Sequence, residues 1–164
     1  MIDYQGGEQM EKEFMAEAIR LSVEKMQARE GGPFGAVIVR KGDIVARGWN
    51  RVTSSNDPTA HAEIVAIREA CRVLNSFWLG DCEIYVSCEP CPMCLAAIYW
   101  AGIPRLYYAA SARDAAGAGF ADQYIYRELL SPVGERNLSM EQAMRQEALT
   151  AFRLWDKLED KIEY

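Results

Sequence analysis

The sequence has no apolar run that approaches the ~18 residues needed for a membrane-spanning helix. It also lacks an excess of positive charge, since 18 Lys and Arg stand against 24 Asp and Glu and leave a net charge of −6. Nucleic-acid-binding proteins usually present a basic surface, so this balance argues against a polyanionic partner. The N-terminus has neither the basic nor the apolar region of a signal peptide. We therefore expect a cytoplasmic protein with no nucleic-acid partner and no membrane attachment.

The chain has a single histidine, His61, whereas five cysteines are present. The cysteines are odd in number, and three of them (Cys88, Cys91 and Cys94) are clustered. Without a secretion signal, this pattern favours metal or redox chemistry over a disulfide framework. A metal held by an imidazole of this chain must use His61.

The chain has 164 residues, which fits a single domain over 1–164 and is enough to bury roughly two thirds of the unfolded surface. Half of the residues are apolar and 26% are charged, which is typical of a globular protein and excludes a disordered or collagen-like chain.

Apolar spacing and turn residues predict alternating helices and strands. Asp57 or Thr59 is expected to cap the second helix, with Pro58 in its first turn. The order predicts an α/β fold, a mixed sheet covered on both faces in a three-layer α/β/α sandwich. Helices are expected over 8–30, 58–74 and 90–101, and strands over 36–39, 44–52, 83–87 and 105–110.

The last third of the chain gives weaker signals. A small-residue stretch covers 115–121, a helix is expected over 122–130, and a Pro/Gly loop follows over 131–138. A final helix is expected over 139–161. Its apolar stripe must cover some surface, and it consists of Ala148, Phe152, Trp155, Leu158 and Ile162.

Two short segments carry groups that suit metal chemistry: His61-Ala62-Glu63 and Pro90-Cys91-Pro92-Met93-Cys94, each at the start of a predicted helix. Cys91 and Cys94 are three residues apart, which puts both sulfurs on one side of a helical turn. Two thiolates and one imidazole are suitable zinc ligands, and three protein ligands leave the fourth tetrahedral position open, as in catalytic sites.

Glu63 is the candidate catalytic group. Residues two apart in mid-helix point about 200° apart, so His61 and Glu63 can share a site only beyond a helix end. Zinc lowers the pKa of bound water to ~7, and a neighbouring carboxylate can take and pass on its proton.

The residues alone leave other interpretations open. A CxxC pair also occurs in redox sites and as half of a structural zinc site. Cys88 could complete a closed site of three cysteines and His61 that has no catalytic role. Cys71 and Cys82 are expected to pack in the core.

The pattern H-x-E followed by P-C-x-x-C is the signature of zinc nucleobase deaminases. Over residues 10–130 the chain resembles the cytidine deaminase-like superfamily, and over nearly its whole length it is similar to the bacterial guanine deaminase family. This resemblance implies a mixed five-stranded sheet. The matching stretches are 32–37, 53–63, 87–94, 97–100 and 119–122.

The resemblance implies that His61, Cys91 and Cys94 bind one Zn²⁺ per subunit. Hydroxide would attack C2 of guanine to give xanthine, while Glu63 would carry a proton to ring N3 and then to the departing ammonia. It further implies that Asn50 and Asp122 bind the purine and that Phe34 and Trp100 wall its ring. The complete implied set of substrate-binding residues is Phe34, Asn50, Ala62, Trp100, Asp122 and Tyr164.

The resemblance also implies a homodimer whose subunits exchange the C-terminal segment 139–164, with Tyr164 closing the partner's site. The loop containing Pro132 and Gly134 is a suitable hinge for such an exchange.

Three alternative functions remain open at this point. Segments 57–63 and 113–115 also look similar to tRNA adenosine deaminases, although the net charge of −6 argues against an RNA substrate. A related small ring, such as guanosine, cytosine or an aminotriazine, is the second alternative. The third is a zinc-stabilised interaction module without catalytic activity.

Overall fold

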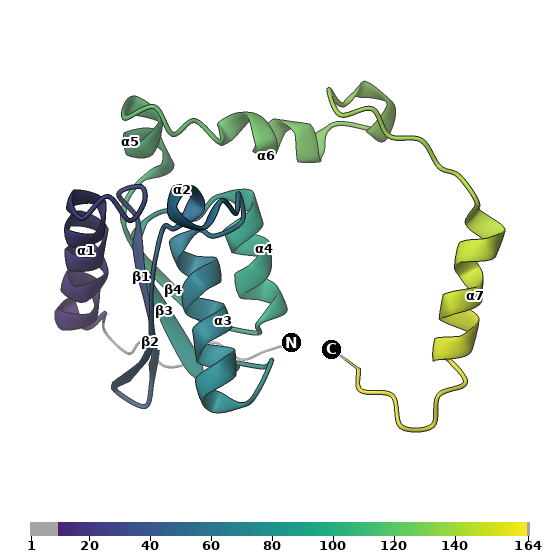
Figure 1. Cartoon of the computed structure of the whole chain (residues 1–164), viewed down its shortest axis with the longest axis horizontal. Coiled ribbons are helices and arrows are strands. Elements are labelled where there is room, and N and C mark those ends of the chain that lie inside the picture. The colour runs from purple at the N-terminus through teal and green to yellow at the C-terminus, as the bar shows by residue number, and fades with distance from the viewer. Residues whose placement is uncertain (1–9, 164) are drawn as a thin grey trace. The chain divides into compact units, whose positions relative to one another are not determined.

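The computed structural model of the protein describes residues 10–163 (Figure 1). The chain divides into two compact units, Met1–Gln123 and Tyr124–Tyr164, which are described separately. Among the described residues, no helix is long and apolar enough to cross a membrane.

The described part of the first unit, residues 10–123, contains four strands and most of the helices. Its elements are α1 (Lys12–Gln27), β1 (Gly35–Arg40), β2 (Asp43–Trp49), α2 (Val52–Ser55), α3 (Ala62–Leu74), β3 (Cys82–Cys88), α4 (Pro92–Trp100), β4 (Arg105–Ala110) and α5 (Ala112–Gly117).

The strands form one mixed sheet in the order β2-β1-β3-β4. β1 runs antiparallel to both β2 and β3, whereas β3 and β4 are parallel. The mixed sheet is as expected, but the expectation of five strands was wrong, because four are present in residues 10–163. After β4 the chain enters a helix cap at Ser111 and the helix α5, so the alanine- and glycine-rich stretch adds no further strand.

Alternation along the strands builds a core on each face of the sheet. In β1, Val37 and Val39 pack in the cluster that contains Phe14 and Leu21 of α1. The intervening Ile38 packs with Ala66 of α3 in the opposite cluster. Figure 1 shows α1 on one side of the sheet and α3 and α4 on the other, which confirms the three-layer α/β/α arrangement.

The start of α3 differs from the sequence prediction. Asp57 does not cap this helix but accepts hydrogen bonds from the backbone N–H and the hydroxyl of Thr59, at 2.8 and 2.7 Å. Asp57 therefore closes a local turn. The N-cap of α3 is His61, four residues later than Asp57, and its extended backbone precedes the first helical residue, Ala62.

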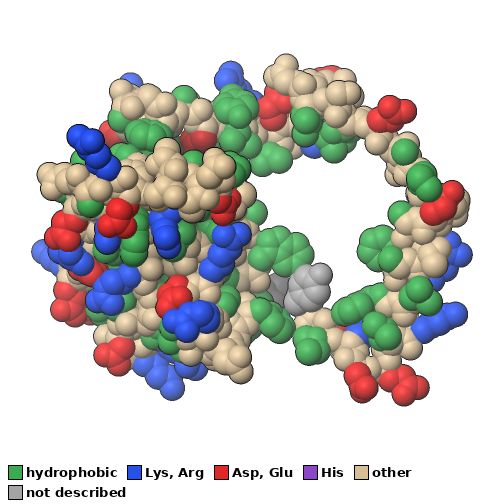
Figure 2. Space-filling view, in the orientation of Figure 1, with side chains coloured by type: hydrophobic (Ala, Val, Ile, Leu, Met, Phe, Trp, Pro, Cys, Tyr) green, Lys and Arg blue, Asp and Glu red, His purple; other side chains and the backbone are tan. Residues whose placement is uncertain are grey.

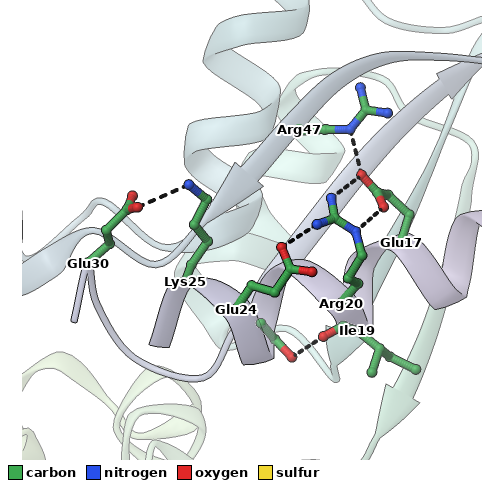
Figure 3. Close-up of polar contacts among 8 residues, drawn as sticks. Glu17, Ile19, Arg20, Glu24, Lys25, Glu30 and Arg47 are labelled. Atoms are coloured by element: carbon green, nitrogen blue, oxygen red, sulfur yellow. Dashed lines mark hydrogen bonds and ion pairs between the residues drawn. The ribbon is translucent and has the colours of Figure 1, made fainter. Parts of the chain in front are cut away.

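A charged network joins α1 to the edge strand β2 (Figure 3). Glu17 accepts from Arg20 at 2.7 Å and from Arg47 of β2 at 2.6 Å, and Arg20 also pairs with Glu24. Hydrogen bonding to Arg20, with a further contribution from Arg47, lowers the pKa of Glu17 to about 2. This network fixes the helix against the sheet at the protein surface.

The second unit contains α6 (Gln123–Leu130, which begins at the last residue of the first unit), the short 3-10 helix η1 (Val133–Glu135) and α7 (Arg145–Trp155). The helix expected over 122–130 is confirmed, whereas the one expected over 139–161 is shorter. None of its described residues, 124–163, is buried. Figure 2 shows hydrophobic side chains along its surface. Phe152 and Ile162 are 67% and 68% exposed.

Candidate metal centre and catalytic site

Two helix starts bring the candidate ligands together. His61 is the N-cap of α3 and Cys91 is the N-cap of α4, both with an extended backbone (φ −69°, ψ 158° and φ −68°, ψ 167°). Pro92 opens α4, where its missing N–H costs nothing, and Cys94 lies in the first turn. Both predicted segments therefore deliver their side chains from helix ends.

The distances between the donor atoms fit a tetrahedral zinc ion. The Nδ1 atom of His61 lies 3.5 Å from the Sγ atoms of both Cys91 and Cys94. A zinc ion with Zn–S of about 2.3 Å and Zn–N of about 2.05 Å separates its nitrogen and sulfur ligands by about 3.5 Å. Within residues 10–163, these three side chains form the one group of histidine, cysteine or carboxylate ligands that could hold an ion.

The electrostatics of the group favour a thiolate. A hydrogen bond from Cys94, reinforced by one with His61, lowers the pKa of Cys91 to about 4. The hydrogen bond between Cys94 and Cys91 raises the pKa of Cys94. The hydrogen bond between His61 and Cys91 raises the pKa of His61. Both neighbours therefore favour the thiolate form of Cys91, which is the form that binds metal.

Glu63 lies beside this group and is buried, with 7% of its surface exposed. Burial is the main cause that raises the pKa of Glu63, and the nearby Cys91 charge raises it further. A carboxyl group whose pKa is raised towards neutrality can both accept and release a proton during a reaction.

The remaining cysteines lie outside the ligand group. The Sγ atom of Cys88 lies 3.6 Å from the carbonyl oxygen of Ser111, so the structure does not place it as a fourth ligand. Cys82 is buried in the core and Cys71 packs against it, as expected. Burial raises the pKa of Cys82 to about 11, which keeps this thiol protonated.

Asn50 is buried and holds two backbone segments through its side-chain oxygen. This Oδ1 atom accepts from the N–H of Gly32 at 3.1 Å and from that of Val52 at 3.3 Å. A side chain on Gly31 would place its Cβ atom 1.8 Å from the Asn50 carbonyl oxygen, so this close approach requires glycine. The side-chain oxygen of Asn50 is thus engaged within the fold, and the amide NH₂ is its remaining donor group.

Asp122 and Phe34 come from separate parts of the first unit. Both His61 and Cys91 act electrostatically on Asp122, whose pKa is raised mainly by burial and then by the Cys91 charge. Phe34 packs edge-to-face on Phe120, with ring centroids 5.0 Å apart. Phe120 was not among the predicted site residues.

Three other predicted residues have different positions. Ala62 is buried between His61 and Glu63. Trp100 ends α4, at the opposite end from Cys91, and is 70% exposed, so the structure does not bring it to the ligand group of this chain. Tyr164 lies outside the described residues.

Sequence analysis also missed α5 and the residue that holds its start. Ser111 and Asp114 form a reciprocal capping box, and Ser-x-x-Asp is a recognisable signal for a helix start. The side chain of Glu89 accepts a hydrogen bond from the N–H of Ala112 at 2.9 Å, and nothing in the local sequence indicates this contact.

The cytidine and deoxycytidylate deaminase zinc-binding region matches residues 8–110 of this chain. This protein belongs to the cytidine and deoxycytidylate deaminase family. The matched region contains His61, Glu63, Cys91 and Cys94, and zinc is the metal that this deaminase family binds.

Within the deaminase family, the chain is 52% identical to the guanine deaminase of Bacillus subtilis over 92% of its own length and 97% of that protein. The crystal structure of the Bacillus subtilis enzyme superimposes with a TM-score of 0.92, at 51% identity, over 95% of this chain and 99% of that one. A structure of guanine deaminase from Nitrosomonas europaea matches with a TM-score of 0.66, at 32% identity, over 69% of this chain and 65% of that one.

The likeness to tRNA-specific adenosine deaminases is shorter. The Aquifex aeolicus protein is 44% identical over 59% of this chain and 64% of its own length. The similarity to guanine deaminase therefore covers a larger share of this chain than the similarity to the tRNA deaminase.

Proposed function

We propose that this deaminase hydrolyses guanine to xanthine and ammonia, with zinc held by His61, Cys91 and Cys94. The observation that carries the proposal is the meeting of this ligand group with a buried Glu63 at two helix starts. The choice of guanine is supported by the similarity to guanine deaminase over nearly the whole chain.

A zinc ion held by His61, Cys91 and Cys94 would supply hydroxide at neutral pH, and this nucleophile would be directed at C2 of guanine. Glu63 takes the proton released by water and delivers it to ring N3. Glu63 would next take the remaining proton from the new hydroxyl group on C2 and give it to the 2-amino group, so that the C2–N bond breaks, ammonia leaves and the C2 carbonyl of xanthine forms. Burial raises the pKa of Glu63, and a raised pKa makes its carboxylate a stronger proton acceptor.

Substrate selection rests on Asp122. Guanine presents two adjacent donors, N1–H and the 2-amino group, whereas N1 of adenine is an acceptor. A carboxylate can accept hydrogen bonds from N1–H and the 2-amino group of guanine, whereas it repels the lone pair on N1 of adenine. Asn50 would donate its amide NH₂ to another edge of the purine, and Phe34 with Phe120 would cover the ring.

The direct test is an assay of the purified, zinc-loaded protein against a panel of bases. We expect guanine to yield equal amounts of xanthine and ammonia, with much slower release from adenine, cytosine, guanosine and tRNA. Absence of guanine turnover in fully loaded protein would refute the proposal. Salt-sensitive binding and deamination of tRNA would favour the adenosine deaminase alternative.

We also propose that the protein is a homodimer that exchanges its C-terminal segment, 139–164, so that Tyr164 closes the partner's site. Exposed apolar side chains in both units support an interface: the first unit exposes Trp78, Tyr99 and Trp100, at 60%, 76% and 70%. In the second unit, α7 exposes Phe152 and Leu154. Light scattering on the eluting protein should give twice the 18.5 kDa chain mass, and a monomer would contradict the proposal.

A cytoplasmic location is proposed on chemical grounds. Cys91 and Cys94 bind metal only while reduced, and a reducing compartment keeps such closely spaced thiols from forming a disulfide.

A further inference from the structure

Glu89 links the metal-binding loop to the start of α5. The residue follows the end of β3 and is two positions before Cys91. Its Oε2 atom accepts a hydrogen bond from the backbone N–H of Ala112, at 2.9 Å, and its own N–H donates to the carbonyl of Ala110 at 2.8 Å. The contact therefore joins two loops that follow the neighbouring parallel strands β3 and β4.

The Glu89 carboxylate satisfies a donor that the helix cap leaves unpaired. Ser111 caps the N–H of Asp114, and Asp114 in return accepts from the N–H of Ser111 at 2.8 Å. The N–H of Ala112, at the first helical position, has no acceptor within the helix. A carboxylate at this end also interacts favourably with the helix dipole, so Glu89 fixes where α5 begins.

A short and tightly bonded path leads from α5 to Asp122. The N–H of Gly119 donates to the carbonyl of Ala116 at 3.1 Å, and that of Phe120 donates to Ala115 at 3.0 Å. Gly119 has a φ of +92°, which few other residues adopt, and the Phe120 ring is held against Phe34. A displacement of α5 is thus passed on to the residues immediately before Asp122.

We propose that Glu89 is a positioning residue for guanine binding, because its hydrogen bond to Ala112 fixes α5 and thereby holds Asp122 at the purine. This inference rests on the proposed function, in which Asp122 binds the substrate. In this role Glu89 contacts neither the donor atoms of the metal ligands nor the purine. We therefore expect a change of Glu89 to alter the affinity for the substrate.

The test measures the binding of 8-azaguanine to zinc-loaded protein that also carries Glu63→Gln, so that this analogue, which keeps the N1–H and 2-amino donors, is not turned over. Zinc content, and kcat and KM for guanine, are measured in protein with Glu63 intact. Glu89→Ala should weaken 8-azaguanine binding and raise KM for guanine about tenfold or more, because small misplacements of binding groups carry large costs. Zinc content should be unchanged. Glu89→Gln should restore binding to within about threefold, since its amide oxygen can still accept from Ala112.

Two further variants separate positioning from general destabilisation. Ala112→Pro removes the donor N–H at a first helical position, and the extended backbone of Ser111 (φ −86°, ψ 163°) is compatible with a following proline. It should reproduce the loss in affinity without altering the metal loop. Glu83→Ala is the matched control, because Glu83 is a partly buried carboxylate near the other end of β3, bonded to Tyr85 and Arg105, and it should leave affinity unchanged.

A double-mutant cycle with Asp122→Ala decides the inference. If Glu89 acts through Asp122, Glu89→Ala adds little once Asp122 is absent. Fully additive losses, unchanged affinity in Glu89→Ala, or loss of zinc from that variant would each overturn the inference while leaving guanine deamination intact. If Asp122→Ala itself leaves 8-azaguanine binding unchanged, the proposed substrate role of Asp122 fails, and the inference fails with it.

Discussion

The two units of this chain differ in how they bury apolar surface. The first unit, Met1–Gln123, packs apolar side chains on both faces of its sheet, whereas no described residue of the second unit, from 124 to 163, is buried. Yet α7 is amphipathic and exposes Phe152 and Leu154. Helices of this length are marginal in water without tertiary packing. The first unit thus holds its metal site on a packed core, whereas the described residues of the second unit form no buried core of their own.

The largest expected effect lies in the first unit. Glu63→Gln removes the proton carrier but keeps a side chain of the same size, so guanine turnover should fall by ~10²–10⁴ or more. Zinc content and the unfolding midpoint should stay close to those of the unaltered protein. Steady-state kinetics and metal analysis provide the measurement, and unchanged turnover would show that the metal group works without this carboxyl group.

Removal of residues 139–164 tests the second unit. The core of the first unit remains intact, so the truncated protein should keep its zinc and unfold cooperatively. Guanine turnover should drop about tenfold or more, because a closing segment excludes water from the site. Kinetics that survive the truncation would rule out a role in closure.

Exchange of the segment between subunits can be tested by complementation. Full-length Glu63→Gln has an intact tail and a defective site, whereas the truncated chain has an intact site and no tail. Co-expressed as a mixed dimer, they should recover turnover well above either variant alone. No recovery in dimers of verified mixed composition would mean that each tail serves its own chain or that no tail closes a site.

Core truncations should sharpen the contrast between the units. Ile38 is fully buried, so Ile38→Ala should lower the free energy of unfolding by about 2–5 kcal/mol. Leu154 of α7 is 60% exposed in this chain. If α7 is exposed to solvent, Leu154→Ala should lower the free energy of unfolding by well under half as much as Ile38→Ala. A comparable loss for Leu154→Ala, measured by denaturant unfolding of the protein, would show that α7 is covered in solution.

The smallest expected effect concerns Glu17 on the surface of the first unit. Its pKa is about 2 in the folded protein, below the ordinary value of 4.5, because Arg20 and Arg47 bind the carboxylate. The stabilisation is therefore present above pH 4.5 and lost as the pH falls towards 2. Glu17→Gln should cost about 1 kcal/mol or less at pH 7 and almost nothing near pH 2. A cost independent of pH in parallel denaturant titrations would contradict this account.

Much of the site could be predicted because its signals are local. The spacing of Cys91 and Cys94 and the pairing of His61 with Glu63 indicate a metal and a proton carrier from residue chemistry alone. The start of α3 was misplaced, because Asp57 and Pro58 carry the chemistry of a helix cap as well as that of a turn. Only the tertiary contacts of the following residues decide between these two structures.

The sequence by itself determined the kinds of residue that bind metal, the alternation that gives the sheet two apolar faces, and the resemblance to a family of deaminases. The tertiary structure decided that four strands form the sheet, that His61 and Cys91 meet as the caps of two neighbouring helices, and that Glu89 reaches Ala112. The physical reason is the separation along the chain over which each kind of interaction acts. Periodicity and spacing act within a few residues, whereas contacts between residues more than twenty positions apart depend on how strands and helices pack.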